Sequence, residues 1–307
     1  MEQDSQTPEI RLPEHASPQP SPLAGDGGEG GPVGRDGFYD HPNQKTARII
    51  ALANQKGGVG KTTTAISLGA ALAEMDQRVL LVDFDPQGGC ALGLGIEPGG
   101  LDLTVYNALL DRNVDVDEVV QKTSVHNLDL LPSNIDLSAA ELMLVHEVAR
   151  EQSLLRVLAG LRVKYDFMLI DCPPSLGLLT INALTAADGV IIPLECEYYA
   201  LRGMAQLMDS IERIRERLNP RLQVDGIVPT MLDSRTLHSK EVLERVREAF
   251  GSRLFDTVIR KTIRFAEAPV AGESILTYAP NSQGAAAYRQ LAQEVMARVS
   301  QSKLARS

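Results

Sequence analysis

The 307-residue sequence has no tryptophan, only 4% aromatic residues and only three cysteines. Cys90, Cys172 and Cys196 are odd in number and form no CxxC pair. We therefore expect neither a disulfide framework nor a metal cage within one chain, but buried thiols in a reducing compartment. No apolar run approaches the roughly 18 to 20 residues that cross a bilayer, so an integral membrane protein is not expected.

The chain also lacks the basic excess of a protein that coats nucleic acid with its whole surface, because 40 acidic residues outnumber 30 basic ones. Hydrophobic residues make up 44% and charged residues 23%, which is typical of a globular protein. Glu2 and Asp4 stand where a secretory signal needs positive charge. The sequence therefore predicts a cytoplasmic protein.

The composition changes near residue 44. Residues 1–44 contain seven prolines, seven glycines, eight acidic and two basic residues, and we expect them to be a disordered acidic tail. Residues 45–302 are predicted to be one α/β domain, and residues 303–307 a short C-terminal tail.

Short apolar runs alternate with longer stretches of helical spacing along the predicted domain. Several of these runs are apolar on both faces, as expected when helices cover both sides of a sheet. The pattern predicts a doubly wound, mainly parallel α/β fold. The predicted strands are 48–54, 78–85, 128–132, 165–171, 189–194, 224–231 and 254–259, and the predicted helices are 61–75, 137–161, 177–187, 199–218, 237–250 and 284–300.

A glycine-rich segment follows the first predicted strand and leads directly into a helix. Its glycines allow backbone N–H groups to turn inward, and the helix N-terminus adds a favourable field for a triphosphate. Lys61 is placed to contact the β and γ phosphates, and the Thr62 hydroxyl is placed to bind Mg²⁺. The predicted phosphate-binding residues are Lys56, Gly57, Gly58, Val59, Gly60, Lys61, Thr62 and Thr63.

This loop departs from the usual GxxxxGK[ST] pattern. Gln55 replaces the first glycine, and Lys56 is an additional cation that turn geometry does not explain. A dinucleotide-binding loop is not predicted, because Thr63 stands where the third glycine of GxGxxG is required.

Carboxylates follow two other predicted strands, at the sheet edge where ligands bind in α/β proteins. Asp171 is predicted to hold Mg²⁺, directly or through water. Asp85 is the predicted catalytic residue that orients the attacking water, alongside Lys56 and Lys61. Asp83, two residues before Asp85, is equally compatible with a turn or cap role.

Charge is unevenly distributed. Residues 83–150 carry 12 acidic and 3 basic side chains, whereas residues 235–264 carry 8 basic and 4 acidic ones. The basic segment predicts a local contact with a polyanion, and the alternative is a set of helix-surface ion pairs.

Three motifs resemble the ParA/Soj chromosome and plasmid partition ATPases: KGGVGKT from Lys56, VDFDPQG from Val82 and IDCPPSLG from Ile170. Further similar segments begin at Glu195, Thr230 and Ile263, so the resemblance covers about residues 46–300. It identifies residues 45–302 as a deviant P-loop ATPase domain with ATP and Mg²⁺ as cofactors.

The resemblance implies that two ATP-bound subunits form a sandwich homodimer in which Lys56 of each reaches the other's phosphates. The dimer is expected to bind DNA non-specifically on the nucleoid, and a ParB-type centromere-binding protein to stimulate slow hydrolysis and release. Arg235 and Arg264 match the family's DNA-contacting arginines. Four phosphate contacts from one dimer give a salt slope of about −3.6 for log K against log[salt].

Some positions depart from the family pattern: Gly89-Cys90 replaces the usual Asn-Ala, Arg202 replaces a frequent Glu, and Arg260-Lys261 replaces Pro-Arg. Three alternative functions are a MinD-like membrane-cycling ATPase, a nitrogenase-reductase-like electron carrier, and a nucleotide-dependent switch with incidental hydrolysis. The first needs a C-terminal amphipathic helix, but the apolar residues of 284–300 predict docking on the sheet, and stable membrane attachment is not expected. The electron carrier needs a second suitably spaced cysteine beside Cys172.

Overall fold

The computed structural model describes residues 46–196, 200–233 and 237–304 of the chain. These residues build a seven-stranded sheet in the order β3-β4-β2-β5-β1-β6-β7. Only the β3–β4 pair of this sheet is antiparallel, and its other pairs are parallel. The strands are β1 (Arg48–Leu52), β2 (Val79–Asp83), β3 (Gln121–Lys122), β4 (Leu128–Leu131), β5 (Phe167–Asp171), β6 (Gly189–Glu195) and β7 (Gln223–Thr230).

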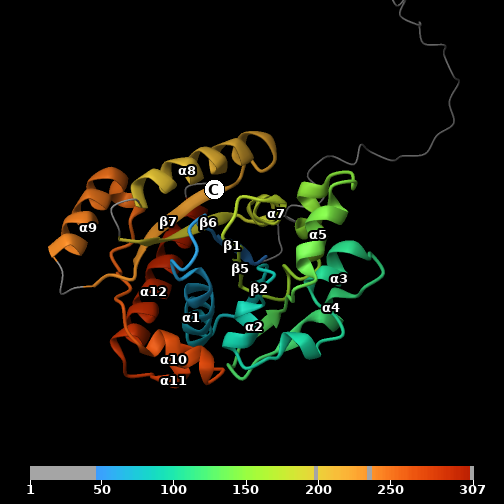
Figure 1. Cartoon of the computed structure of the whole chain (residues 1–307), viewed down its shortest axis with the longest axis horizontal. Helices are drawn as coiled ribbons and strands as arrows, with labels where there is room; N and C mark the ends of the chain where they lie inside the picture. Colours follow the sequence, from blue (N-terminus) through green and yellow to red (C-terminus); the bar gives the residue numbers. More distant parts are fainter. Residues whose placement is uncertain (1–45, 197–199, 234–236, 305–307) are drawn as a thin grey trace, which may run out of the picture. The chain divides into compact units, whose positions relative to one another are not determined.

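Helices cover both faces of the sheet (Figure 1), which confirms the predicted doubly wound α/β fold. On one face α1 packs on the central strands beside α12, and on the other α7 packs between α6 and α8. The helices are α1 (Lys61–Glu74), α2 (Gly89–Gly93), α3 (Val105–Leu110), α4 (Val116–Val119), α5 (Leu137–Leu144), α6 (Ser153–Ala159), α7 (Leu178–Ala186), α8 (Ala200–Arg217), α9 (Leu237–Phe250), α10 (Arg264–Val270), α11 (Ile275–Tyr278) and α12 (Gln283–Leu304).

The central strands β1, β2 and β5 are buried at every position, because helices lie on both sides of them. Helix α12 buries its apolar side against α1 and β7, as its spacing predicts. Tyr288, Leu291 and Val295 are at most 1% exposed, and the Tyr288 hydroxyl lies 3.2 Å from Thr64 Oγ1 of α1. This apolar face therefore belongs to the core.

The predicted helix over 137–161 is wrong, because the chain forms α5 and α6 with a break between them. Ala149 adopts a left-handed conformation with φ 56°. The buried Asn182 of α7 fixes the new start, since its side chain accepts from Leu154 N at 3.1 Å and donates to Arg150 O at 2.9 Å. A tertiary contact thus ends a pattern that looks continuous in the sequence.

The predicted strand over 254–259 is also wrong. The segment runs beside β7, with Phe255 N donating to Ile227 O and Ile259 N to Pro229 O. Between these two bonds, however, the N–H groups of Asp256 and Thr257 both donate to the Glu294 carboxylate of α12 at 2.9 Å. Because α12 takes these donors, only isolated bridges form in place of a strand.

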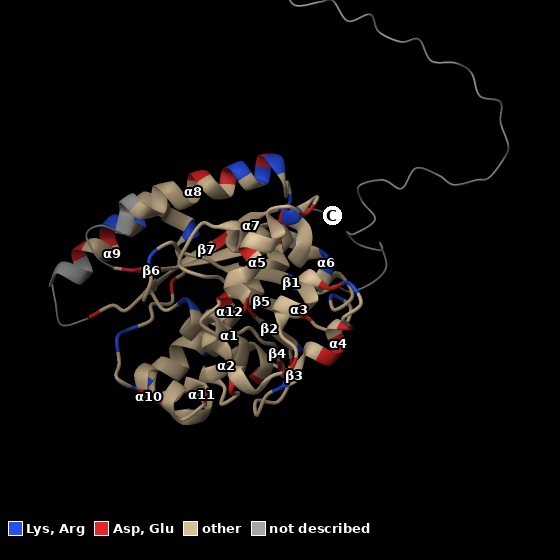
Figure 2. Ribbon diagram, turned by 45° about the vertical axis from the view of Figure 1, so that its right-hand side comes forward, with Lys and Arg blue, Asp and Glu red and all other residues tan. Residues whose placement is uncertain are grey.

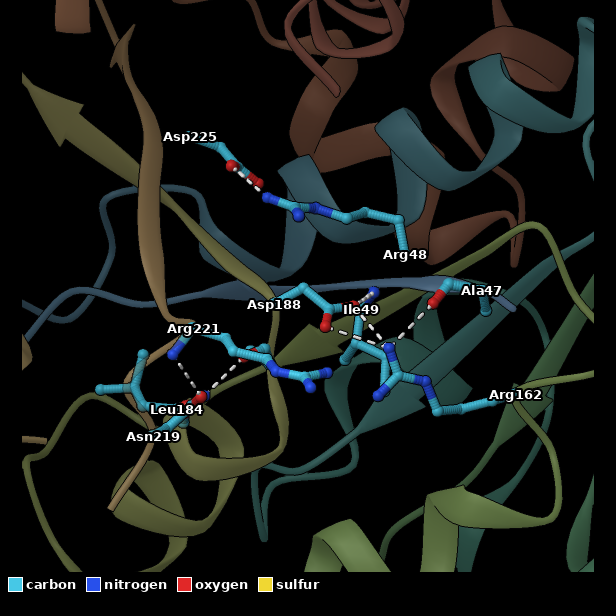
Figure 3. A network of polar contacts seen from close by, with 10 residues as sticks. Ala47, Arg48, Ile49, Arg162, Leu184, Asp188, Asn219, Arg221 and Asp225 are labelled. Atoms are coloured by element: carbon cyan, nitrogen blue, oxygen red, sulfur yellow. Dashed lines mark hydrogen bonds and ion pairs between the residues drawn. The ribbon is translucent and has the colours of Figure 1, made fainter. Parts of the chain in front are cut away.

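Buried polar groups join the sheet at the end opposite the carboxyl edge of its parallel strands (Figure 3). Arg48 at the start of β1 pairs with Asp225 of β7 at 2.6 Å, and both side chains are less than 10% exposed. Arg162 pairs with Asp188 at 2.9 Å, and Asp188 also accepts from Ile49 N at 2.8 Å. These contacts fix the amino ends of β1, β6 and β7 relative to one another.

Removal of Asp225 from its buried pair with Arg48 leaves the charge of the guanidinium uncompensated. We expect Asp225→Ala to lower the free energy of unfolding by about 3–5 kcal/mol. In contrast, Glu212→Ala breaks the half-exposed Glu212–Arg215 pair of α8 and should cost at most about 1 kcal/mol. Urea unfolding followed by circular dichroism measures both values, and equal losses in the two variants would contradict the assignment.

Candidate nucleotide-binding site

The loop between β1 and α1 has the backbone that a phosphate cradle requires. Gly58 and Gly60 have φ of 76° and 86°, a left-handed conformation that glycine adopts without a Cβ clash. Gly60 is the N-cap of α1, and its carbonyl accepts the first helical bond from Thr64 N at 2.9 Å. Thr230, the last residue of β7, donates to Val59 O at 2.8 Å and holds the loop against the sheet.

Lys61 begins α1 and lies beneath this loop. The side chain is buried, and Nζ donates to the carbonyl oxygen of Lys56 at 3.3 Å. Burial lowers the pKa of the Lys61 ammonium, and the nearby carboxylate of Asp171 partly opposes this effect. An anion bound beside this ammonium would therefore stabilise the charge that burial destabilises.

Asp171 ends β5, beside Leu52 of β1 and Asp83 of β2 in register. The side chain is fully buried, and burial raises the pKa of its carboxyl to about 6, although hydrogen bonds from Thr62 and Cys90 lower it. Oδ1 of Asp171 has no hydrogen-bond partner in the described part of the protein. A buried carboxylate oxygen without a partner, next to a threonine hydroxyl, fits the oxygen ligands that Mg²⁺ requires.

Asp83 has a structural role, whereas the sequence was equally compatible with a role in the site and a turn or cap role. Its Oδ2 accepts from the backbone N–H groups of Cys90 at 2.9 Å and Ala91 at 3.3 Å, at the start of α2. The side chain is fully buried, and burial together with Asp171 raises the pKa of its carboxyl well above the usual range. Asp83 therefore anchors α2 to the end of β2.

Asp85 lies beyond the end of β2, in the turn that leads to α2. Its Oδ1 accepts from Gln87 N at 3.0 Å, and its backbone carbonyl accepts from the Ser133 hydroxyl. The side chain is partly exposed, and its charge acts on both Lys61 and Asp171. The structure thus brings Asp85 to the same edge of the sheet as the loop.

Lys56 differs from Lys61 in its surroundings. Its side chain is 48% exposed, and Nζ forms an ion pair with Glu195 Oε2 at 2.7 Å. Glu195 ends β6 at the carboxyl edge of the sheet. Glu195 was not among the predicted site residues, although the strand-end rule that selected Asp171 applies to it equally.

The remaining predicted residues divide into two groups. Gly57 and Thr63 lie in the loop and in the first turn of α1. Arg264 is exposed at the start of α10, whereas Arg235 lies outside the described residues. Arg264, Arg260 and Lys261 line a hollow of about 570 Å³ that Ser282 and Gln283 also border. This hollow therefore carries three basic side chains on its rim.

Comparison with known proteins identifies the family. A family model described as an AAA domain matches residues 47–224. The chain is 49% identical over 250 residues to the sporulation initiation inhibitor protein Soj of Bacillus subtilis, which covers 81% of this chain and 98% of Soj. It is 48% identical over 253 residues to the chromosome partitioning protein ParA of Caulobacter vibrioides, which covers 82% and 94% of the two chains. The chain belongs to the ParA/Soj family of partition ATPases.

A solved structure similar to this ParA/Soj-type ATPase is cobyrinic acid a,c-diamide synthase from Mycobacterium smegmatis with bound ADP and magnesium. The two chains have a TM-score of 0.71 and 43% identity, which covers 80% of this chain and 93% of that one. A second structure of the same protein holds an ATP analogue and magnesium. The predicted cofactors, ATP and Mg²⁺, agree with these ligands. Among the residues described here, no helix combines the length and the apolar character needed to span a membrane.

The raised pKa of Asp171 predicts how the ligand-free protein depends on pH. The folded state binds the proton more tightly than the unfolded state, so the wild type loses stability as pH rises from about 4 to 6. Asp171→Asn removes this charge, and we expect its melting temperature to exceed that of the wild type above pH 6, by the equivalent of about 2–3 kcal/mol.

The gain from Asp171→Asn should disappear at pH 4. Thermal unfolding without nucleotide or Mg²⁺ between pH 4 and 8 measures this difference. Asp136→Asn, at an exposed position before α5, is the matched control and should change the melting temperature little. An Asp171→Asn variant that is less stable than the wild type at pH 8 would contradict the interpretation.

Proposed function

We propose that ATP joins two copies of this partition ATPase, and that the resulting dimer binds DNA without sequence preference. A ParB-type partner then stimulates hydrolysis and releases the dimer from DNA. The observation that supports this proposal is the contrast between the two loop lysines. One is buried under its own loop, and the other lies half-exposed at the same edge.

Lys61 and Lys56 cannot perform the same task. The buried Lys61 ammonium is held close to its own loop and serves the phosphates bound there. The exposed Lys56 ammonium pairs with Glu195, which is 24% exposed, so solvent screens this contact. A triphosphate on a second subunit carries more negative charge than one carboxylate and can compete for Lys56. This exchange makes pairing of subunits depend on bound ATP.

The other site residues fit the hydrolysis of ATP. Thr62 and Asp171 are the proposed Mg²⁺ ligands, and the ion, when bound, neutralises charge on the phosphates. Asp85 is the proposed residue that orients the attacking water, because it lies at this edge on a partly exposed turn. Ser133 holds the backbone of that turn in place.

The proposed DNA contact lies at Arg264. Basic residues from the segment before α10 surround the hollow described above, and Figure 2 shows this segment apart from the strongly acidic α4. Arg260 and Lys261 are exposed and add to the positive surface. Few phosphate contacts per subunit predict weak, salt-sensitive binding, which suits a protein that must be released.

The first prediction of this proposal separates the two lysines. We expect Lys56→Ala to bind ATP with Mg²⁺ but to remain monomeric, because it loses the charge that reaches a second subunit. Pairing should weaken at least about fivefold, since even a well-screened charge contact at 4 Å is worth about 1–4 kcal/mol. Light scattering with a non-hydrolysable ATP analogue measures the mass, and a fluorescent analogue measures binding.

Lys61→Ala is the matched control, at the other lysine of the same loop. It should lose nucleotide binding and pairing together. If Lys56→Ala pairs as tightly as the wild type while it holds the nucleotide, ATP-dependent pairing through this residue is wrong.

The second prediction concerns DNA. Titration of duplex DNA should show binding with ATP, and much weaker binding with ADP or without nucleotide. Log K should fall with log[salt] at a slope of about −3.6. Arg264→Glu should abolish binding, whereas Arg112→Glu, at an exposed arginine between α3 and α4, should leave it unchanged.

A lipid arm tests the MinD-like alternative. If the ATP-bound chain sediments with anionic vesicles but does not bind DNA, membrane cycling is favoured instead. Equal DNA binding in all three nucleotide states would contradict the proposed cycle. If the chain leaves DNA while ATP stays bound and unhydrolysed, a switch in which hydrolysis is incidental is favoured.

A further inference from the structure

A thiol lies inside the carboxylate cluster at the end of β2 and β5. Asp83, Cys90 and Asp171 each offer a ligand atom, and these three atoms lie within 4.8 Å of one another. All three side chains are fully buried. Cys90 lies in α2, whose first turns Asp83 anchors. Cys90 was predicted to be a buried thiol and departs from the family pattern, and the proposed ATPase cycle gives it no role.

The distances within the cluster suit a bound ion. Cys90 Sγ lies 3.4 Å from Asp171 Oδ2. A tetrahedral ion with a sulfur ligand at about 2.3 Å and an oxygen ligand at about 2.0 Å separates the two donors by about 3.5 Å. The observed separation is therefore already close to that of two ligands of one ion. One carboxylate oxygen of Asp83 lies within 4.8 Å of both other ligand atoms, so Asp83 can supply the third donor.

The electrostatics of the cluster also favour a cation. Two buried carboxylates lie next to each other, and Lys61 is the cation that acts on Asp171. Oδ1 of Asp171 is buried and has no hydrogen-bond partner within the described residues. A divalent ion would satisfy this oxygen and offset the repulsion between the carboxylates.

The geometry points to a binding site for a thiophilic divalent cation of the Zn²⁺ or Cd²⁺ class, formed by Cys90 Sγ and Asp171 with Asp83 as a third donor. A thiolate favours such soft ions over Mg²⁺, which prefers oxygen ligands. On binding, the thiol releases its proton to the buffer and no electron is transferred. Because the proposed function also assigns Mg²⁺ to Asp171, the two ions compete for this residue.

The test uses Cd²⁺ and the full chain without nucleotide, after removal of metals and in a reductant that contains no thiol. Binding of one Cd²⁺ should produce the thiolate-to-Cd²⁺ charge-transfer absorption in the ultraviolet. Cys90→Ala should lose this band. Cys172→Ala and Cys196→Ala are matched controls at the two other buried cysteines, and they should retain it.

A second variant tests the oxygen donor. Asp171→Asn keeps the thiol and should weaken Cd²⁺ binding roughly 10- to 100-fold. Cys90→Ser nearly preserves the size of the side chain, so loss of the band in this variant, with an unchanged circular dichroism spectrum and melting temperature, excludes loss of the fold as the cause. Absence of the band in the wild type, or its persistence in Cys90→Ala, would overturn the proposal. Neither readout depends on ATP, pairing or DNA. Failure of the cation-site proposal therefore leaves the proposed function untouched.

Discussion

The interaction on which the site depends is the electrostatic attraction between the buried Lys61 ammonium and the buried Asp171 carboxylate. A lysine ammonium and a carboxylate both lose hydration at this edge of the sheet, and each partly stabilises the charge of the other. The parallel order of the strands creates this contact. Since β1 lies directly beside β5, the loop that follows Leu52 must begin next to Asp171. The remaining site residues are arranged around these two charges.

Burial sets the difference between the two loop lysines. The buried Lys61 ammonium stays beneath its own loop, because it could reach solvent only if the loop opened. A charge at the rim, such as Lys56 in its pair with Glu195, is screened by solvent. Loop residues five positions apart therefore differ in what they can reach. In this fold the fixed lysine suits binding within a subunit, and the rim lysine suits contact with another.

The sequence was sufficient for the parts of the site that local pattern controls. The glycine-rich segment between an apolar strand and a helix predicted the loop, and its glycines at 58 and 60 take the left-handed conformation. The strand-end rule predicted that Asp171 and Asp85 would meet it. These predictions held because strand order in a parallel sheet brings all carboxyl ends to one edge, whatever the details of packing. The same rule would also have selected Glu195.

Other features depend on contacts that no local pattern contains. The Glu294 carboxylate accepts from the N–H groups of Asp256 and Thr257 beside β7, and Asn182 ends the run that looked like one helix. The pairing of Cys90 with Asp171 requires α2 to pack against β2 and α1, and a five-residue helix is too short for its periodicity to predict. Charged and amide side chains that bond to distant backbone thus account for most of the differences.

The two ends of the sheet are built on opposite electrostatic principles. At the amino ends, Arg48 and Arg162 each meet a carboxylate, so buried charge is compensated within the chain. At the carboxyl ends, Asp83 and Asp171 are buried together, and burial raises the pKa of both carboxyls. Such an edge destabilises the ligand-free protein and is stabilised by any cation that enters it. The paired amino ends hold the strands in place while the carboxyl ends keep this affinity for an ion, so the same sheet can be both firmly folded and ready to bind.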